Sequence, residues 1–212
     1  MEVYGVKPKK FTKEWWGYFW YYYKWHTAGV LFAMFLIVTT LVQCVTQTKY
    51  DLQVDYITEN YIISEQEEKL TQIIEANIDD VTQNGKAEAF LMTFNMAENN
   101  DPQMTQALTT KLFVELGYSD GYVFIVSKKY ADMVLEHGIM EDTSVWAGDL
   151  ANDSGVISLA GCKVLSDIGI DAEEQDLYIG VLKMREDKKE DELEIAKYEN
   201  GKKFAQFLIN QR

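Results

Sequence analysis

The sequence predicts an α/β protein with a single N-terminal transmembrane helix, followed by a three-layer α/β/α domain with a mostly parallel sheet. Three observations lead to this prediction. Residues 28–45 form a mostly apolar run without a charged residue, an aromatic cluster precedes that run, and strand-like and helix-like segments alternate after it. We therefore divide the chain into a basic and aromatic juxtamembrane segment at 1–26, a transmembrane helix at 27–48, and an extracytoplasmic α/β domain at 50–212.

The apolar run has the length of a membrane span. No formally charged residue occurs between Lys24 and Lys49. The 18 residues from 28 to 45 would span about 27 Å as a helix, and a bilayer's hydrocarbon core is about 30 Å thick. A buried core helix is the alternative, but such helices are usually shorter and carry a polar stripe, which this run lacks.

The aromatic cluster occupies residues 14–27, where nine of 14 residues are Trp, Tyr or Phe. Trp and Tyr favour the headgroup region because they combine an apolar ring with a polar N–H or O–H. On a helix these rings would cover every face, whereas a base-stacking platform needs its rings on one face. Rings on every face also suit contact with a partner's transmembrane helices. The predicted membrane-interface residues are Trp15, Trp16, Trp20, Tyr21, Tyr22, Tyr23 and Trp25.

The charge distribution predicts the orientation. Residues 1–26 hold five lysines against two glutamates, whereas residues 51–212 hold 14 basic and 32 acidic residues, a net charge of −18. Lysine-rich flanks stay cytoplasmic, so we expect a single-pass protein of the cell membrane with a cytoplasmic N-terminus and an extracytoplasmic C-terminal domain. An acidic domain repels phosphate backbones, which disfavours nucleic-acid binding.

Two other interpretations of the N-terminus stay open. A cleaved signal peptide would need an unusually long basic region, and no small-x-small cleavage site follows the apolar run. In a lipoprotein, Cys44 of LVQC would carry the lipid, but Gln43 stands where a small residue is expected.

The domain begins with a strand, a helix and a second strand. Residues 51–58 alternate apolar and polar side chains, which is typical of a strand. Ser64 and Glu67 form a capping box for a helix whose apolar positions continue to Val81, before the turn sequence QNGK. Residues 87–96 predict a strand that is apolar enough to be covered on both faces.

The same alternation continues. Asp101 and Pro102 predict a helix start, and Gly117 its end. A third strand is expected at 121–126, followed by a short helix that Ser127 caps. This order favours parallel strands joined by right-handed crossovers.

The last third of the domain is less regular. Gly138 should end the short helix, and residues 139–175 are rich in Gly, Ser and Asp. Residues 176–184 predict a strand. Eight charged residues follow at 185–192, which indicate a solvated loop or helix start, and then a C-terminal helix.

Two stretches resemble known proteins. YFWYYYKWHTAGVLFAMFLIV resembles the N-terminal anchor of uncharacterised membrane proteins of Gram-positive bacteria. The chain from DLQVDYITENYIISEQEEKL to ALTTKLFVELGYSDGYVFIVSKKYADMVLEHGIMED resembles one lobe of an extracellular solute-binding protein. The residues that match that family's pattern are Lys111, Leu112, Leu116, the strand 123–126, and Gly138 with Asp142.

This resemblance covers about half of the chain. A complete solute-binding protein has two lobes and about twice this length of soluble chain, and its ligand lies between the lobes. The resemblance therefore implies at most a single lobe that binds a small solute or peptide, alone or paired with another copy. It assigns no binding residue by position.

Motifs for catalysis, cofactors or metals are weak, and we predict no enzyme, no cofactor and no metal site. Asp80, Thr82, Asn84 and Gly85 match part of a calcium loop, but Leu91 stands where a bidentate glutamate is needed. A turn after a helix is the preferred interpretation of this stretch.

Three further residues could suggest a hydrolase. Ser127, Asp132 and His137 have the residue types of a catalytic triad, but no G-x-S-x-G motif accompanies them. His137 is expected to interact with the carbonyls at the end of its helix. Cys162 is more typical of a small buried residue than of a nucleophile.

The leading hypothesis is a membrane-anchored interaction domain, an accessory or assembly subunit of a membrane complex near a transporter. Its expected partners are the lipid bilayer and a membrane protein or a second copy of itself, without nucleic acid. The alternative is a small-solute or peptide binding module built from one lobe, and a hydrolase using His137 or Cys162 ranks last.

The orientation makes a first testable prediction. In a chain without native cysteines, a cysteine at Asp153 should react with a membrane-impermeant maleimide on intact cells. A cysteine at Lys10 should react only after the cells are permeabilised. The reverse labelling pattern would show that the acidic domain is cytoplasmic.

Overall fold

The computed structural model describes residues 9–46, 49–97, 101–118 and 121–212, without the side chains of residues 43–46. It divides into two compact units, Met1–Thr48 and Lys49–Arg212. Lys7 and the side chain of Cys44, on which the orientation and lipidation hypotheses partly depend, lie outside the described residues.

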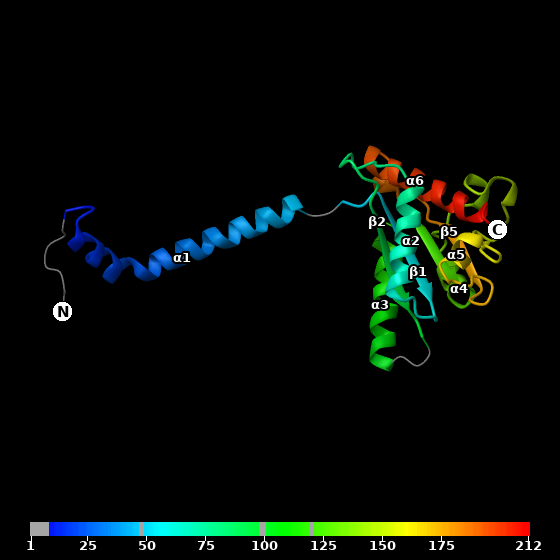
Figure 1. The fold of residues 1–212 in the computed structure, drawn as a ribbon, viewed down its shortest axis with the longest axis horizontal. Coiled ribbons are helices and arrows are strands. Elements are labelled where there is room, and N and C mark those ends of the chain that lie inside the picture. Colours follow the sequence, from blue (N-terminus) through cyan, green and yellow to red (C-terminus); the bar gives the residue numbers. More distant parts are fainter. Residues whose placement is uncertain (1–8, 47–48, 98–100, 119–120) are drawn as a thin grey trace. The chain divides into compact units, whose positions relative to one another are not determined.

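The described part of the first unit consists mainly of one helix, α1 (Lys13–Thr46), of 34 residues, about 50 Å long at the helical rise. It includes the aromatic cluster as well as the apolar run (Figure 1). Its segment Lys13–Val42 is long and apolar enough to cross a membrane, and no residue of its most apolar window is buried. An N-terminal signal sequence would share these properties.

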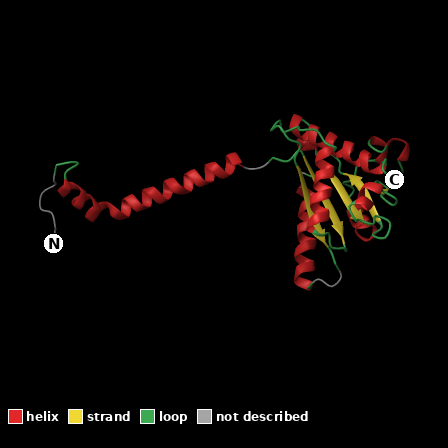
Figure 2. Ribbon diagram, in the orientation of Figure 1, coloured by secondary structure: helices red, strands yellow, loops and turns green. Residues whose placement is uncertain are grey.

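The second unit contains a five-stranded sheet in the order β2-β1-β3-β5-β4, within the described residues (Figure 2). β1 pairs in parallel with β2 and β3, whereas β5 pairs antiparallel with β3 and β4. The sheet is therefore mostly parallel, as predicted, with β5 as its reversed strand. The strands are β1 (Leu52–Thr58), β2 (Ala89–Asn95), β3 (Val123–Ser127), β4 (Ile157–Ser158) and β5 (Leu177–Val181).

Helices alternate with these strands as the sequence predicts. β1, β3 and β5 are almost completely buried, and α6 packs against all three. The helices are α2 (Ser64–Ala76), α3 (Pro102–Tyr118), α4 (Lys128–Glu136), α5 (Lys163–Asp167) and α6 (Glu192–Ile209).

The start and end of α2 differ from the prediction. Ile63, in extended conformation, is the residue before the helix, and its backbone N–H donates to Gln66 Oε1 at 3.2 Å. The capping interaction is thus one residue earlier than the Ser64–Glu67 box. The helix ends at Ala76 rather than near Val81, and the Asn77 amide donates to the Ile73 carbonyl at 2.8 Å.

Helix α3 starts as predicted, because the backbone N–H of Gln103 donates to Asp101 Oδ1 at 2.8 Å. Ser127 precedes α4, but its hydroxyl does not cap that helix. It donates instead to Glu59 Oε2 at 2.6 Å, so that it joins the ends of β1 and β3. Gly138 ends α4 with a positive φ of 64°.

A buried carboxylate holds the beginning of the sheet. Asp51 is fully buried, and its side chain accepts backbone N–H bonds from Val81, Thr82 and Glu88 at 2.7–2.9 Å. Buried Asn200 of α6 donates to the Asp51 carbonyl at 3.3 Å. The connection between α2 and β2 is thereby attached to the first residue before β1.

The irregular segment 139–175 is ordered by its own hydrogen bonds and by Trp146. The Thr143 hydroxyl exchanges hydrogen bonds with the backbone of Asn152, and the Asn152 amide donates to Val156 at 3.1 Å. Trp146 is fully buried. Strand β4, which the sequence did not predict, has only two residues.

Helix α6 approaches the sheet closely at Gly201. A methyl group at this position would lie 3.1 Å from Tyr122 Cβ, 3.2 Å from Val123 Cγ2 and 3.6 Å from Leu52 Cδ1. The absence of a side chain is therefore what lets the helix reach β1 and β3.

We predict that Gly201→Val destabilises residues 49–212 by about 2 kcal/mol, because overpacking forces backbone shifts. Urea unfolding followed by Trp146 fluorescence would measure the change. The matched control is Gly117→Val in α3, where nothing lies within 4 Å of the added carbon. Equal stability of the two variants would contradict the proposed close approach.

Candidate functional site: a pocket with an apolar floor and a cationic rim

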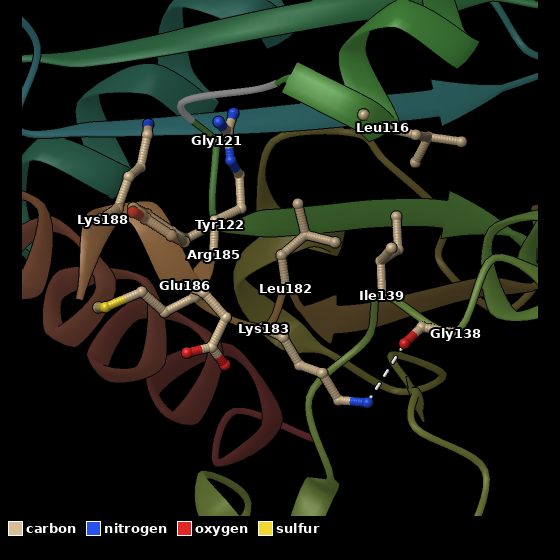
Figure 3. Close-up of a pocket in the computed structure, with 12 residues that line it drawn as sticks. Leu116, Gly121, Tyr122, Gly138, Ile139, Leu182, Lys183, Arg185, Glu186 and Lys188 are labelled. Carbon is tan, nitrogen blue, oxygen red and sulfur yellow. Dashed lines mark hydrogen bonds between the residues drawn. The ribbon is translucent and has the colours of Figure 1, made fainter.

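A pocket of about 300 Å³ lies where β5 ends and β3 begins (Figure 3). Its walls come from four parts of the chain: the end of α3, the residues just before β3, the turn after α4, and the chain that follows β5. Backbone bonds join the chain after β5 to two of the other walls, since Leu182 N–H donates to the Tyr122 carbonyl at 2.9 Å and Lys183 N–H to the Ile139 carbonyl at 2.8 Å.

The floor of the pocket is apolar. Leu116 and Leu182 are buried, and Ile139 and Met184 are partly exposed. Figure 3 shows Leu182 and Ile139 side by side. A volume near 300 Å³ is at the lower end of the range for small-molecule pockets, which are also mostly apolar.

The rim of the pocket is cationic, although the domain is strongly acidic. Lys183, Arg185 and Lys188 line it together with Glu186. Arg185 forms two bonds to Asp187, at 3.0 and 2.6 Å, and Glu186 pairs with Lys189 at 2.6 Å. The Lys183 ammonium donates to the carbonyl oxygen of Gly138 at 3.2 Å. Lys183 also lines two neighbouring depressions.

A buried hydrogen-bond network fixes Lys188. Glu194 of α6 is 8% exposed and accepts from Tyr122 at 2.9 Å, from Lys188 at 2.8 Å and from Lys197 at 2.9 Å. Burial alone would raise the pKa of Glu194, but these three donors outweigh it and lower the pKa. The carboxylate is therefore held in its charged form, and it positions one ammonium group at the rim.

A second aromatic residue lies next to this network. Tyr198 packs edge-on against Tyr122, with ring centroids 5.5 Å apart, and donates to Glu141 at 2.9 Å. Burial, followed by the hydrogen bond to Glu141, raises the pKa of Tyr198, so this phenol stays protonated.

The predicted membrane-interface residues all lie on α1, and six of the seven are exposed. Only Trp15 is partly covered. Successive rings contact one another along one side of the helix, from Phe11 through Trp15 and Phe19 to Tyr23, at centroid distances of 5.4, 5.4 and 5.7 Å. The rings thus remain available to lipid or to another protein.

Helix α3 also exposes apolar side chains on the face away from its buried Leu112 and Leu116. Met104, Val114 and Tyr118 are more than half exposed. The Tyr118 ring lies 6.0 Å from the Arg185 guanidinium, so this face continues to the pocket rim.

The stretch that partly matched a calcium loop is a hydrogen-bonded turn. Asp80 accepts from the backbone N–H groups of Asn84 and Gly85 at 3.2 and 2.8 Å. Gly85 has a positive φ of 93°, which favours glycine there. Among the residues described, no group of three or more His, Cys, Asp or Glu side chains could hold a metal ion.

The residues considered for hydrolysis are not brought together. Ser127 and His137 flank opposite ends of α4, and His137 Nδ1 lies 2.7 Å from the Met133 carbonyl oxygen, as expected for a residue at a helix end. Cys162 is buried, with its sulfur 3.6 Å from the Leu208 carbonyl. Burial raises the pKa of this thiol, which disfavours the reactive thiolate.

Sequence reasoning did not identify the pocket. Its residues come from positions 116 to 188 and share no motif. The sequence feature that corresponds to the pocket is the group of Lys and Arg residues that follows the last predicted strand. We interpreted these residues as solvent-exposed charges. Lys183 and Arg185 alternate with Leu182 and Met184, a pattern that places two apolar and two cationic side chains in one short stretch.

Three comparisons of the chain, with protein-family models, with curated proteins and with solved structures, found no match.

The Glu194 network makes a testable prediction. Because the pKa of Glu194 is lowered in the folded state, its interactions stabilise the fold above the ordinary glutamate pKa and are lost as the pH falls through the folded-state pKa. Glu194→Gln should cost about 2 kcal/mol at pH 7. It should also make stability between pH 6 and about 3 less dependent on pH.

Urea unfolding at a series of pH values would measure both effects. Glu65→Gln is the control, because Glu65 pairs with Lys69 on the exposed surface of α2 and should contribute nothing measurable. An unchanged pH profile in Glu194→Gln would contradict the stabilising role of the network.

Proposed function

We propose that the chain is a membrane-anchored, extracytoplasmic interaction domain, an accessory or assembly subunit of a membrane complex near a transporter. The mechanism is tethering. An anchored domain stays near partners in the same membrane, which raises its effective concentration without requiring a large interface. Few residues separate Thr46, the last residue of α1, from Leu52, the first of β1.

The length of the aromatic part of α1 supports this proposal. Its 14 residues, 14–27, extend about 21 Å along the helix. A headgroup region is only about 5–7 Å thick on each side of the bilayer. An upright helix therefore carries more rings than one headgroup region can cover, and we propose that transmembrane helices of a partner protein cover the rest.

The proposed orientation follows the positive flank. Lys9, Lys10, Lys13 and Lys24 precede the apolar run, and a domain with a net charge of −18 follows it. Such a distribution favours a cytoplasmic N-terminus and an extracytoplasmic domain.

We further infer that helices cover both faces of the sheet, as a three-layer arrangement requires. The Gln53 side chain of β1 donates to Glu115 of α3 at 2.6 Å, whereas neighbouring Leu52 lies beside Gly201 of α6. Successive side chains of a strand point to opposite faces. A ligand or partner would then reach the sheet at its ends rather than on its faces.

The second candidate function is a module that binds a small solute or peptide. The pocket of about 300 Å³, with its apolar floor and cationic rim, favours this function. It lies at the end of the sheet and is lined by side chains of the 49–212 unit alone, so it needs no second lobe.

Co-purification tests the interaction function. In detergent, the full chain should retain a membrane protein in a fixed stoichiometry. Trp16→Leu with Trp20→Leu should reduce that recovery at least tenfold, because large interfacial rings are lost while apolar character is kept. Phe32→Leu with Phe35→Leu, in the apolar run, is the matched control.

Membrane fractionation must show equal insertion of all three chains. If the chain with Trp16→Leu and Trp20→Leu still co-purifies with the membrane protein, these two rings contact lipid and not the partner. If the full chain is soluble in a vesicle-free lysate without detergent, the anchoring itself is wrong.

A further inference from the structure

We propose that two copies of the chain associate through helix α3, as a short parallel pair of helices related by a two-fold axis along their length. The contact surface is a row of five residues, the α3 stripe: Met104, Ala107, Lys111, Val114 and Tyr118. This inference rests on the proposed anchoring in a membrane, and it names a second copy of the chain as a partner there.

The α3 stripe has the spacing of a coiled-coil contact. Its residues follow one another at intervals of three, four, three and four positions, which are the a and d positions of two heptads. All five side chains are exposed, and Met104, Val114 and Tyr118 are 54, 56 and 75% exposed. Helix α3 turns a different face, with buried Leu112 and Leu116, toward the core. The α3 stripe is thus a largely apolar surface that the domain does not use for its own core.

The charge distribution favours a second copy as the partner. Residues 51–212 carry a net charge of −18, so two copies repel each other over most of their surface. Helix α3 has only two charged residues, Lys111 and Glu115, and both are engaged within their own chain. The Lys111 ammonium lies 5.0 Å from the centre of the Phe94 ring, and Glu115 accepts from Gln53 at 2.6 Å. The α3 stripe contains no carboxylate, so two acidic domains can meet there without placing negative charges opposite each other.

The single lysine of the α3 stripe favours a pair of helices over a larger assembly. One Asn or Lys at an a position restricts the register and the oligomeric state of a coiled coil. Because the Lys111 ammonium lies over the Phe94 ring of its own domain, its methylene groups would face the neighbouring helix. Two copies can therefore align their Lys111 residues, whereas a bundle of more helices would enclose the charges.

The direction of α3 is compatible with two copies anchored in one membrane. β2 and β3 are both parallel to β1, so the helix that connects them must run back toward the edge where β1 starts (Figure 1). In a parallel pair of α3 helices, both domains present this edge on the same side. An antiparallel pair would point the two edges in opposite directions.

The small size of the α3 stripe implies that the pair depends on the membrane. Five residues from each copy are fewer than the roughly 20–30 residues that each partner contributes to a stable interface. Anchoring in one membrane raises the effective concentration of the second copy, which offsets this difference. We therefore expect dimers in the membrane and monomers in dilute detergent.

Disulfide crosslinking of the full chain in membrane vesicles would test the proposal. In a chain without native cysteines, Ala107→Cys should form a crosslinked dimer on mild oxidation, because the two-fold axis places the two cysteines opposite each other. Gln106→Cys is the matched control. Gln106 is also exposed, but its side chain projects about 100° away around the helix, so its crosslinked fraction should be at least tenfold lower.

A second substitution tests the charge argument. Val114→Asp, added to the Ala107→Cys chain, should lower the crosslinked fraction at least tenfold, because it places two carboxylates opposite each other. Gln106→Asp, added to the same chain, should leave the crosslinked fraction unchanged. Circular dichroism and thermal unfolding must show that all variants remain folded.

Membrane fractionation separates this inference from the anchoring on which it rests. If the chain sediments with the vesicles but Ala107→Cys gives no more crosslinking than Gln106→Cys, the α3 pair is wrong. Crosslinks that form only in mixtures of Ala107→Cys and Val114→Cys chains would show an antiparallel pair and overturn the parallel one. A chain that stays soluble in a vesicle-free lysate would overturn the anchoring, whatever the crosslinks show.

Discussion

The fold of the acidic domain depends on the buried carboxylate of Asp51. Three backbone N–H groups from the connection between α2 and β2 converge on it, and Asn200 binds its carbonyl from α6. Buried peptide groups need partners, and here one side chain supplies several of them at the residue before β1. The first strand, its neighbour β2 and the last helix are consequently held in one arrangement around a single residue.

Much of the fold could be predicted because its signals are local. The strand at Leu52–Thr58 alternates polar and apolar residues, and the start of α3 follows from Asp101 and Pro102. The end of α2 could not be predicted in the same way. Ile78 is buried as a helical pattern requires, yet it lies after the helix, where the loop that binds Asp51 begins. Tertiary contacts override the periodic pattern there.

The candidate pocket could not be predicted, and the reason is topological. Its floor exists only because β5 runs antiparallel to β3, which brings Leu182 beside Tyr122 and Ile139. A pattern of strand residues does not reveal strand direction. The aromatic residues of α1 are the opposite case, because each ring contacts rings that lie close to it in the sequence, along one helix. Their positions on a helix were predicted from the sequence, and their contact with lipid or with a partner's helices stays a prediction.

The reversal of β5 also determines which end of the sheet carries the pocket. Val181, at the end of β5, is paired with Val123, at the start of β3, and Val123 is level with Val54 in β1. The pocket therefore opens at the edge where the chain enters β1 from α1. The backbone hydrogen bonds that form this edge, from Leu182 to Tyr122 and from Lys183 to Ile139, therefore lie at the end of the domain that the chain reaches first.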